Sequence, residues 1–202
     1  MSVFFTSDLH IGHRFVAGTR NFFDEDNVNE KDEAAPDTEA HDEWVADLWD
    51  SAVKKGDTVF ILGDVSVNGK QEVLDWIGAR PGIKHLIAGN HDPVHPANVR
   101  SLTHQKHWLE YFATIQPFLR RKLLGHSLLL SHFPYFGEGG RPGGDRYTQY
   151  RLRDEGLPLL HGHTHGPERQ VGHMLHVGLD AWMDLVPQDN VIEFVKEHYE
   201  NA

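Results

Sequence analysis

The stretch Thr-Val-Phe-Ile-Leu-Gly-Asp at residues 58–64 decides the fold class, because an apolar run here stops at a glycine and an aspartate. A short apolar run bounded by turn residues is typical of a buried strand. Residues 3–6 and 84–88 have the same form, and apolar residues at helical spacing in 43–55 and 72–79 separate the three runs. This alternation predicts an α/β fold, in which ligands collect beyond the carboxyl ends of parallel strands.

The second half of the chain predicts a mixed or antiparallel sheet. A hairpin is expected where 118–124 and 127–131 flank Gly125 and His126. Further short strands are expected at 157–160, 174–177 and 191–195. In the first half, a helix is expected from Gly12 to Arg20, and the polar stretch from Asp24 to Asp42 is interpreted as an exposed loop.

Length and composition favour one domain spanning residues 1–202. The chain has no cysteine, which excludes disulfides and thiolate metal sites and is compatible with a reducing cytoplasm. Residues 1–6 run directly into a strand and do not resemble a signal peptide. No apolar run approaches the roughly 20 residues that cross a bilayer, so we expect a cytoplasmic protein without membrane contact.

The net charge of −11 is concentrated in one segment. Residues 24–43 hold ten carboxylates and one lysine, which leaves −2 for the rest of the chain. The acidity therefore does not exclude an anionic substrate elsewhere. The chain has no stripe of lysine and arginine of the kind that binds duplexes, so no strong nucleic-acid surface is expected.

Five short motifs, each close to the end of an apolar run, supply oxygen and nitrogen ligands. They are Asp8-Leu9-His10, Gly63-Asp64, Gly89-Asn90-His91-Asp92, Ser131-His132 and Gly162-His163-Thr164-His165. Carboxylate, amide and imidazole ligands without a thiolate suit Mn, Fe, Zn, Co or Ni better than a structural zinc site. Side chains two positions apart at a strand end project to the same side, as expected within the first and last motifs. We predict a two-metal hydrolytic centre for phosphate esters, with Asp64 as the bridging carboxylate.

The order of these motifs resembles the calcineurin-like metallophosphoesterase superfamily from Asp8 to His165. The surrounding sequence is most similar to the small stand-alone enzymes of bacteria and phages, of the actinobacterial and mycobacteriophage type. The resemblance implies a four-layer α/β/β/α sandwich with two mixed sheets. It also implies two divalent metal ions, with Mn²⁺ expected and Fe, Zn, Co, Ni or Mg as alternatives.

The resemblance also assigns roles to individual residues. It implies in-line attack of water on phosphorus, with His91 as the acid for the leaving oxygen. Many family members carry an acidic or imidazole residue three positions after the bridging aspartate, where it orients this histidine; here the position is Val67, so the partner of His91 is open. The implied ligands are Asp8, His10, Asp64 and His165 for one metal, and Asp64, Asn90, His132 and His163 for the other.

Three further residues are candidates for substrate contact. His13 lies at an expected helix start, where it either donates to a phosphate or makes a structural hydrogen bond. Arg141 and Arg146 could clamp a phosphate, but Asp145 and Glu155 are nearby alternatives as ion-pair partners. His161 is expected to support the last motif rather than to bind metal.

A small phosphodiester is the preferred substrate, since the chain leaves little room for a capping domain and the site should be open. The resemblance points to 2′,3′-cyclic nucleotides. Phosphomonoesters are the first alternative, and a nuclease of the same superfamily is the second. A catalytically inactive, metal-bound interaction protein is a third alternative, and full metal loading without turnover would favour it.

Overall fold

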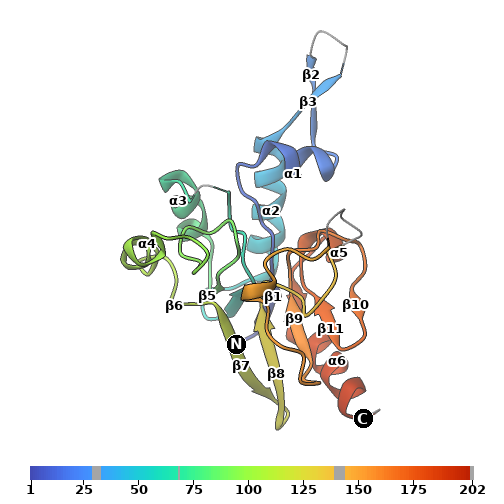
Figure 1. The fold of residues 1–202 in the computed structure, drawn as a ribbon. Helices are drawn as coiled ribbons and strands as arrows, with labels where there is room; N and C mark the ends of the chain where they lie inside the picture. Colours follow the sequence, from blue (N-terminus) through green and yellow to red (C-terminus); the bar gives the residue numbers. More distant parts are fainter. Residues whose placement is uncertain (29–32, 68, 139–143, 201–202) are drawn as a thin grey trace.

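The computed structural model describes residues 1–28, 33–67, 69–138 and 144–200. Two five-stranded sheets form its centre (Figure 1). The first has the order β12-β1-β4-β5-β6, in which β12 is antiparallel and the other strands are parallel. Its strands are β1 (Val3–Thr6), β4 (Thr58–Ile61), β5 (Ile83–Ile87), β6 (Thr114–Gln116) and β12 (Val186–Pro187).

The second sheet has the order β10-β11-β9-β8-β7, with antiparallel outer pairs and parallel inner pairs. Its strands are β7 (Phe118–Leu123), β8 (His126–Ser131), β9 (Leu159–His161), β10 (Gln170–Val171) and β11 (Met174–His176). The α/β class with two mixed sheets, expected from the sequence, is confirmed.

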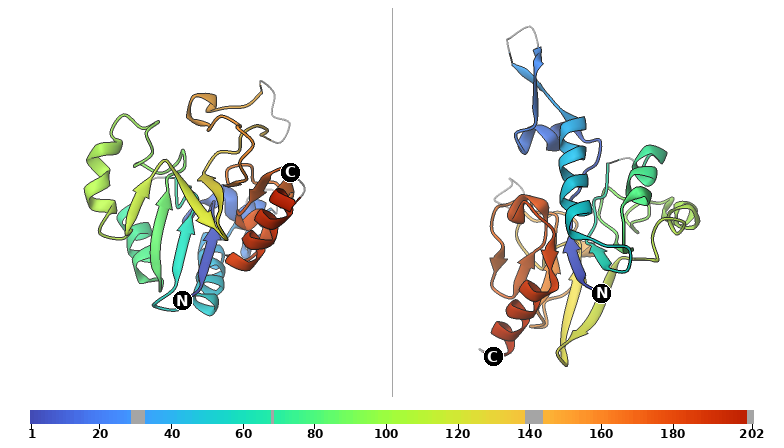
Figure 2. Two further views of the ribbon diagram at one scale, coloured as in Figure 1. Left: turned by 90° about the horizontal axis from the view of Figure 1, so that it is seen from below. Right: turned by 180° about the vertical axis from the view of Figure 1, so that it is seen from behind.

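Alternating side chains of the strands divide the apolar core into layers. In β4, Val59 and Ile61 pack with helices α2 (Thr38–Ala52) and α3 (Gln71–Ala79) on one face. Phe60 points to the other face, into a core that the two sheets share with α6 (Gln188–Glu200). The outer face of the second sheet packs against Tyr135 and Leu152. The two further views in Figure 2 show these elements from below and from behind.

Two expectations for local structure are wrong. Residues 191–195 lie within helix α6, because the apolar side chains of Val191, Phe194 and Val195 recur at helical spacing and face the core. Within the stretch 24–42, expected as a loop, the described residues form β2 (Phe23–Val28) and β3 (Ala34–Pro36), which pair as an arm that projects from the body (Figure 1). After this arm α2 begins early, at Thr38, because the Asp37 carboxylate accepts a hydrogen bond from the Ala40 amide at 2.9 Å.

The remaining elements are short, and of these the sequence predicts only α1. They are α1 (Arg14–Thr19), α4 (Ser101–Trp108), the 3₁₀ turn η1 (Thr148–Tyr150) and α5 (Leu179–Trp182). Helix α1 matches the helix expected from Gly12 to Arg20, with shorter bounds. Among the described residues, no helix has the length and apolar character needed to span a membrane.

Candidate metal centre

The loops that follow five strands meet at one edge of the two sheets. Backbone hydrogen bonds continue beyond the strand ends, from the Asp8 amide to Gly63 O (2.9 Å) and from the His10 amide to Asp64 O (3.1 Å). The His163 amide donates to Asp8 Oδ2 at 3.0 Å and thereby ties the second sheet to the first. The His91 amide donates to Asp64 Oδ1 (2.9 Å) and the Gly162 amide to His132 O (3.0 Å), so all five sequence motifs lie side by side.

Asp8, His10 and His165 form the first of two triads whose ligand atoms lie within 4.8 Å of one another. His10 Nε2 lies 3.1 Å from His165 Nε2 and 3.9 Å from Asp8 Oδ1. His165 Nε2 lies 3.5 Å from the same Asp8 oxygen. Three donor atoms thus converge on one point, which we name the first triad.

The second triad consists of Asp64, His132 and His163, all buried. His132 Nε2 lies 3.5 Å from Asp64 Oδ2, and Asn90 Oδ1 lies 3.1 Å from the same nitrogen. His132 Nδ1 donates to Leu62 O at 2.7 Å, which turns Nε2 toward the triad. The amide oxygen of Asn90 therefore adds a fourth donor here.

Asp64 belongs to the second triad and also lies close to the first. Its Oδ2 is 3.8 Å from His10 Nε2 in the first triad and 3.5 Å from His132 Nε2 in the second. Burial and the neighbouring Asp8 carboxylate raise the pKa of Asp64 well above its ordinary value. A divalent cation on either side would offset this cost, so the charge balance of the centre fits metal binding.

The backbone of the centre is strained. Positive φ angles occur at five residues of the expected ligand set: Asp8 (57°), His10 (50°), Asp64 (55°), His163 (74°) and His165 (52°). Each such angle costs on the order of 1 kcal/mol in a residue with a side chain and is typical of functional sites. The side chains of Asp8 and His10 therefore converge through left-handed turns, and not through the strand geometry that the sequence suggested.

Comparison with known proteins agrees with this geometry. The model of the calcineurin-like phosphoesterase family matches residues 1–167. The chain belongs to the calcineurin-like phosphoesterase family. It is similar to the Gene 66 proteins of Mycobacterium phage L5 (42% identity, covering 98% of this chain and 96% of the relative) and Mycobacterium phage D29 (46%, covering 97% and 96%).

The fold is also similar to a solved structure, a protein of unknown function from Aquifex aeolicus. The two share 21% identity with a TM-score of 0.67, over 96% of this chain and 99% of that one. Membership of the calcineurin-like phosphoesterase family makes the protein a metal-dependent phosphoester hydrolase, and the two triads are groups able to hold its metal ions.

In this phosphoesterase the two loops that carry Asp64 and Asn90 pack without space between them. A Cβ atom on Gly63, whose φ is +91°, would lie 2.6 Å from the Gly89 amide nitrogen. Asp92 holds the loops together, since its carboxylate accepts hydrogen bonds from the amides of Asp64 (3.0 Å) and Gly89 (2.8 Å). Burial raises the pKa of Asp92 to about 7.

Two carboxylates outside the predicted ligand set, the buried Glu138 and the half-buried Asp180, support the histidines of the last motif. Glu138 Oε1 lies 2.5 Å from His163 Nε2, which leaves Nδ1 as the nitrogen available to a metal. Asp180 Oδ2 lies 2.9 Å from His165 Nδ1, which leaves Nε2 facing the first triad. A carboxylate behind a ligating histidine fixes its tautomer and ring orientation, so these contacts fit a metal centre. Sequence reasoning missed both residues, because neither lies next to a ligand in the chain.

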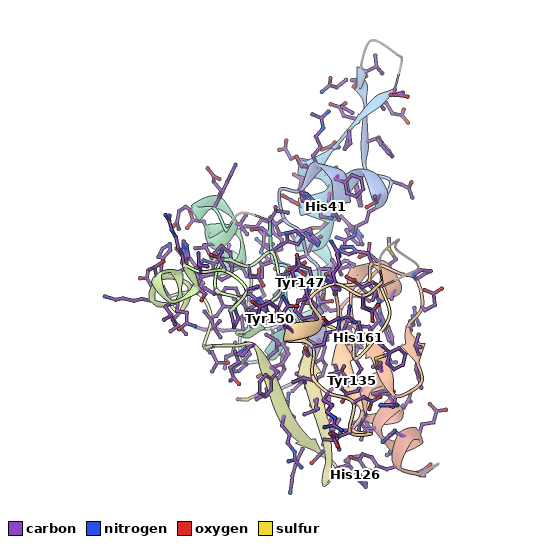
Figure 3. All side chains as sticks on the ribbon, in the orientation of Figure 1. His41, His126, Tyr135, Tyr147, Tyr150 and His161 are labelled. Atoms are coloured by element: carbon purple, nitrogen blue, oxygen red, sulfur yellow. The ribbon has the colours of Figure 1, made fainter. Side chains whose placement is uncertain are left out.

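Arg20 anchors Asp180 and the loop of the first triad together. Its guanidinium donates to both Asp180 oxygens, at 3.0 and 2.8 Å, and to Asp8 O at 2.7 Å. It also donates to His41 Nε2 at 3.0 Å. Figure 3 shows His41 where the projecting arm joins the body. The buried arginine thus connects α2 to a histidine of the first triad.

His91 lies beside both triads with a partly open ring. Its amide donates to Asp64 Oδ1 at 2.9 Å, and its Nε2 lies 4.0 Å from Asp64 Oδ2. The side chain is 43% exposed, and its ring makes no hydrogen bond to any residue that the structure describes. Val67, three positions after Asp64, offers no polar group to orient the ring.

The candidates for substrate contact differ in their surroundings. The His13 ring lies 5.3 Å from the His10 ring, centroid to centroid. Arg146 does not stand free, since its Nε lies 3.2 Å from Glu138 Oε1, and Arg141 lies outside the described residues. His161, expected to support the last motif and labelled in Figure 3, is buried, and its Nδ1 donates to Gly162 O at 2.8 Å.

Proposed function

We propose that this phosphoesterase hydrolyses small phosphodiesters at a two-metal centre. Asp8, His10, Asp64 and His165 would hold one metal, and Asp64, Asn90, His132 and His163 the other. The observation that carries the proposal is the place of Asp64, whose Oδ2 lies within 3.8 Å of a histidine nitrogen from each triad. The bound metals, for which we propose Mn²⁺, supply Lewis-acid stabilisation of phosphate charge and lower the pKa of water.

His91 is the residue proposed to complete the reaction. Its fixed amide and exposed ring place Nε2 at the open side of the centre, near Asp64 Oδ2. From there the ring can donate a proton or a hydrogen bond to the leaving oxygen. Asp64 accepts a hydrogen bond from the His91 amide, so the proposed bridging carboxylate also fixes the backbone of the proposed acid.

The exposure of the centre supports a diester rather than a monoester. His91 is 43% exposed and the His165 side chain 31% exposed, so the centre opens to the surface. An open centre accommodates a phosphate with substituents on two oxygens. Among such substrates we propose 2′,3′-cyclic nucleotides.

Hydrolysis of bis-p-nitrophenyl phosphate beside p-nitrophenyl phosphate tests the proposal, with metal-stripped protein reloaded with Mn²⁺. Faster turnover of the diester is the expected result. Faster turnover of the monoester would overturn the substrate class and leave the metal centre standing. Full metal loading without turnover of either ester would favour an inactive interaction protein.

A further inference from the structure

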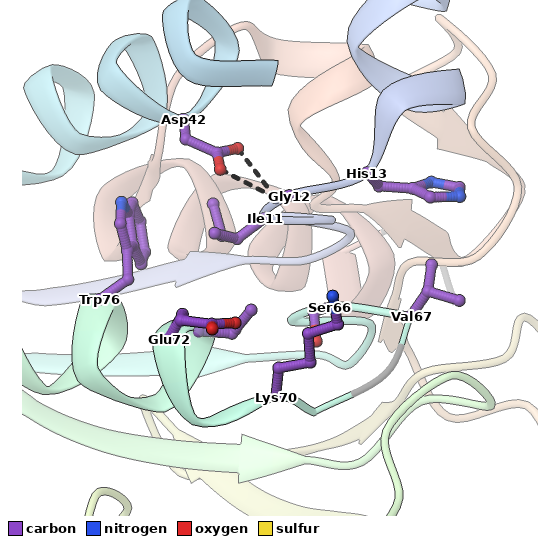
Figure 4. Close-up of a pocket in the computed structure, with 10 residues that line it drawn as sticks. Ile11, Gly12, His13, Asp42, Ser66, Val67, Lys70, Glu72 and Trp76 are labelled. Atoms are coloured by element: carbon purple, nitrogen blue, oxygen red, sulfur yellow. Dashed lines mark hydrogen bonds between the residues drawn. The ribbon is translucent and has the colours of Figure 1, made fainter.

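A pocket of about 520 Å³ lies beside the metal centre, between α2 and α3. We name it the α2–α3 pocket. Figure 4 shows His13 and Val67 at one end of it and Trp76 at the other, with Lys70 and Glu72 along the side that α3 provides. Its volume lies in the range of small-molecule sites, roughly 300–1,000 Å³.

His13 belongs to the lining of the pocket and also lies beside the metal centre. His13 stands at its near end, with its ring 5.3 Å from the ring of His10, which in turn lies 5.6 Å from the ring of His91. Val67 follows the bridging Asp64 by three residues. A substituent on a phosphate held at the centre can therefore pass His13 and Val67 and extend toward Trp76.

The polar groups of the pocket have capacity for a ligand. Among the described residues, neither the Lys70 ammonium nor the Glu72 carboxylate makes a hydrogen bond or an ion pair, and His13 Nδ1 is buried without a partner. Asp42 is different, since both of its oxygens accept from the Gly12 amide, at 3.1 and 2.8 Å, and so it fixes the wall (Figure 4). The half-buried Trp76 ring adds an aromatic group to the lining, and the Arg80 guanidinium lies over this ring, 5.1 Å from its centroid.

These groups favour a neutral ring that carries both donors and acceptors. One ammonium and one carboxylate without partners match an acceptor and a donor on the ligand, and the carboxylates of Asp42 and Glu72 disfavour a second anion. An indole ring can stack on a flat heterocycle, and this stacking tolerates different substituents on the heterocycle. We propose that the α2–α3 pocket binds a neutral heteroaromatic substituent of the nucleobase type on the substrate. This proposal rests on the proposed function for the position of the phosphate.

Calorimetry of the full-length, Mn²⁺-loaded protein with AMP and with ribose 5-phosphate tests this proposal. The two ligands have the same phosphate and sugar, and only AMP carries a base. We expect AMP to bind on the order of tenfold more tightly than ribose 5-phosphate. Equal dissociation constants, or the absence of binding heat from both ligands, would overturn the proposal.

Variants locate the difference within the pocket. Trp76→Ala should remove the advantage of AMP and leave the affinity for ribose 5-phosphate unchanged. Because Trp76 also packs against the core, Lys70→Met is a second variant that leaves the core intact, and it should reduce the advantage of AMP in part. Lys106→Met on α4 is the matched control and should behave as the unchanged protein. An AMP advantage that survives in both pocket variants would place the base elsewhere.

The binding experiment needs no turnover, so its outcome is distinct from that of the proposed function. A protein that prefers AMP but hydrolyses neither nitrophenyl ester keeps the pocket and loses the reaction. A protein that hydrolyses the diester but binds both ligands equally keeps the reaction and loses the pocket.

Discussion

The two triads use the same types of ligand but are held by different parts of the molecule. The first triad is partly open, with His165 31% exposed, and Asp180 and the buried Arg20 support it. The second triad is fully buried, and its His163 is supported by Glu138, whose own partners are Arg146 and Arg151. The two triads therefore depend on different supporting residues. Asp180 and Arg20 support the first triad, and Glu138, in the segment after β8, supports the second.

Asp64→Asn should have the largest effect, because Asp64 belongs to the second triad and its Oδ2 also lies 3.8 Å from His10 Nε2 of the first. We expect activity on every phosphate ester to fall by about 10³-fold or more, since the variant weakens both metal sites at once. Metal content by mass spectrometry, measured beside hydrolysis of bis-p-nitrophenyl phosphate, checks this. Turnover close to that of the unchanged protein would contradict the two-metal assignment.

Removal of the carboxylate charge behind one histidine should lower the Mn²⁺ affinity of one triad only. Asp180→Asn and Glu138→Gln each keep the shape of the side chain and remove its charge. We expect each to weaken Mn²⁺ binding at its own triad by roughly 10–100-fold and to leave the other triad unchanged. Calorimetric Mn²⁺ titration resolves the two sites.

Asp154→Asn is the matched control for these two variants. It breaks a carboxylate–histidine contact of the same kind, since Asp154 Oδ1 lies 2.9 Å from His173 Nε2, but away from the centre. It should leave both Mn²⁺ affinities unchanged. Equal weakening by all three variants would show a general loss of stability instead of local support.

His91→Ala should leave both triads loaded and slow the reaction selectively. A proton donor matters more for a poor leaving group, so we expect about a 10²-fold loss with poor leaving groups and a smaller loss with nitrophenolate. A series of aryl phosphodiesters with graded leaving groups measures the slope. An equal loss across the series would contradict the role of His91 as the acid.

His95 should produce the smallest effect, and it acts on the side of the second triad. Burial, aided by the neighbouring His132, lowers the pKa of His95 to about 4, and its Nδ1 accepts from the Ala97 amide. As the pH falls below the ordinary value of 6.5, the unfolded chain binds the proton first, so the stabilisation present above pH 6.5 is lost toward pH 4.

Urea unfolding at pH 7 and pH 5 measures this loss. We expect His95→Gln to reduce the decrease in unfolding free energy between the two pH values by on the order of 1 kcal/mol. Identical decreases in the variant and the unchanged protein would show that His95 takes up its proton without cost in the folded state.

The meeting of the predicted ligands could be foreseen because parallel strands end at one edge of a sheet. The carboxylates that support the histidine ligands could not be foreseen, because contacts such as that of Asp180 with His165 form only when distant segments of the chain pack together. The same limit explains helix α6, since an apolar, β-branched run such as 191–195 has a local preference for a strand. There, packing of Val191 and Phe194 against both sheets overrides that preference.

The contact between Arg20 and Asp180 also has a consequence for the order of assembly during synthesis. A growing chain leaves the ribosome from its N-terminus, so the residues of the second triad and Glu138 emerge before Asp180. His165 therefore leaves the ribosome before Asp180, the residue whose carboxylate orients its ring. Orientation of His165 therefore waits for the segment that contains α5, whereas Glu138 is already present to orient His163.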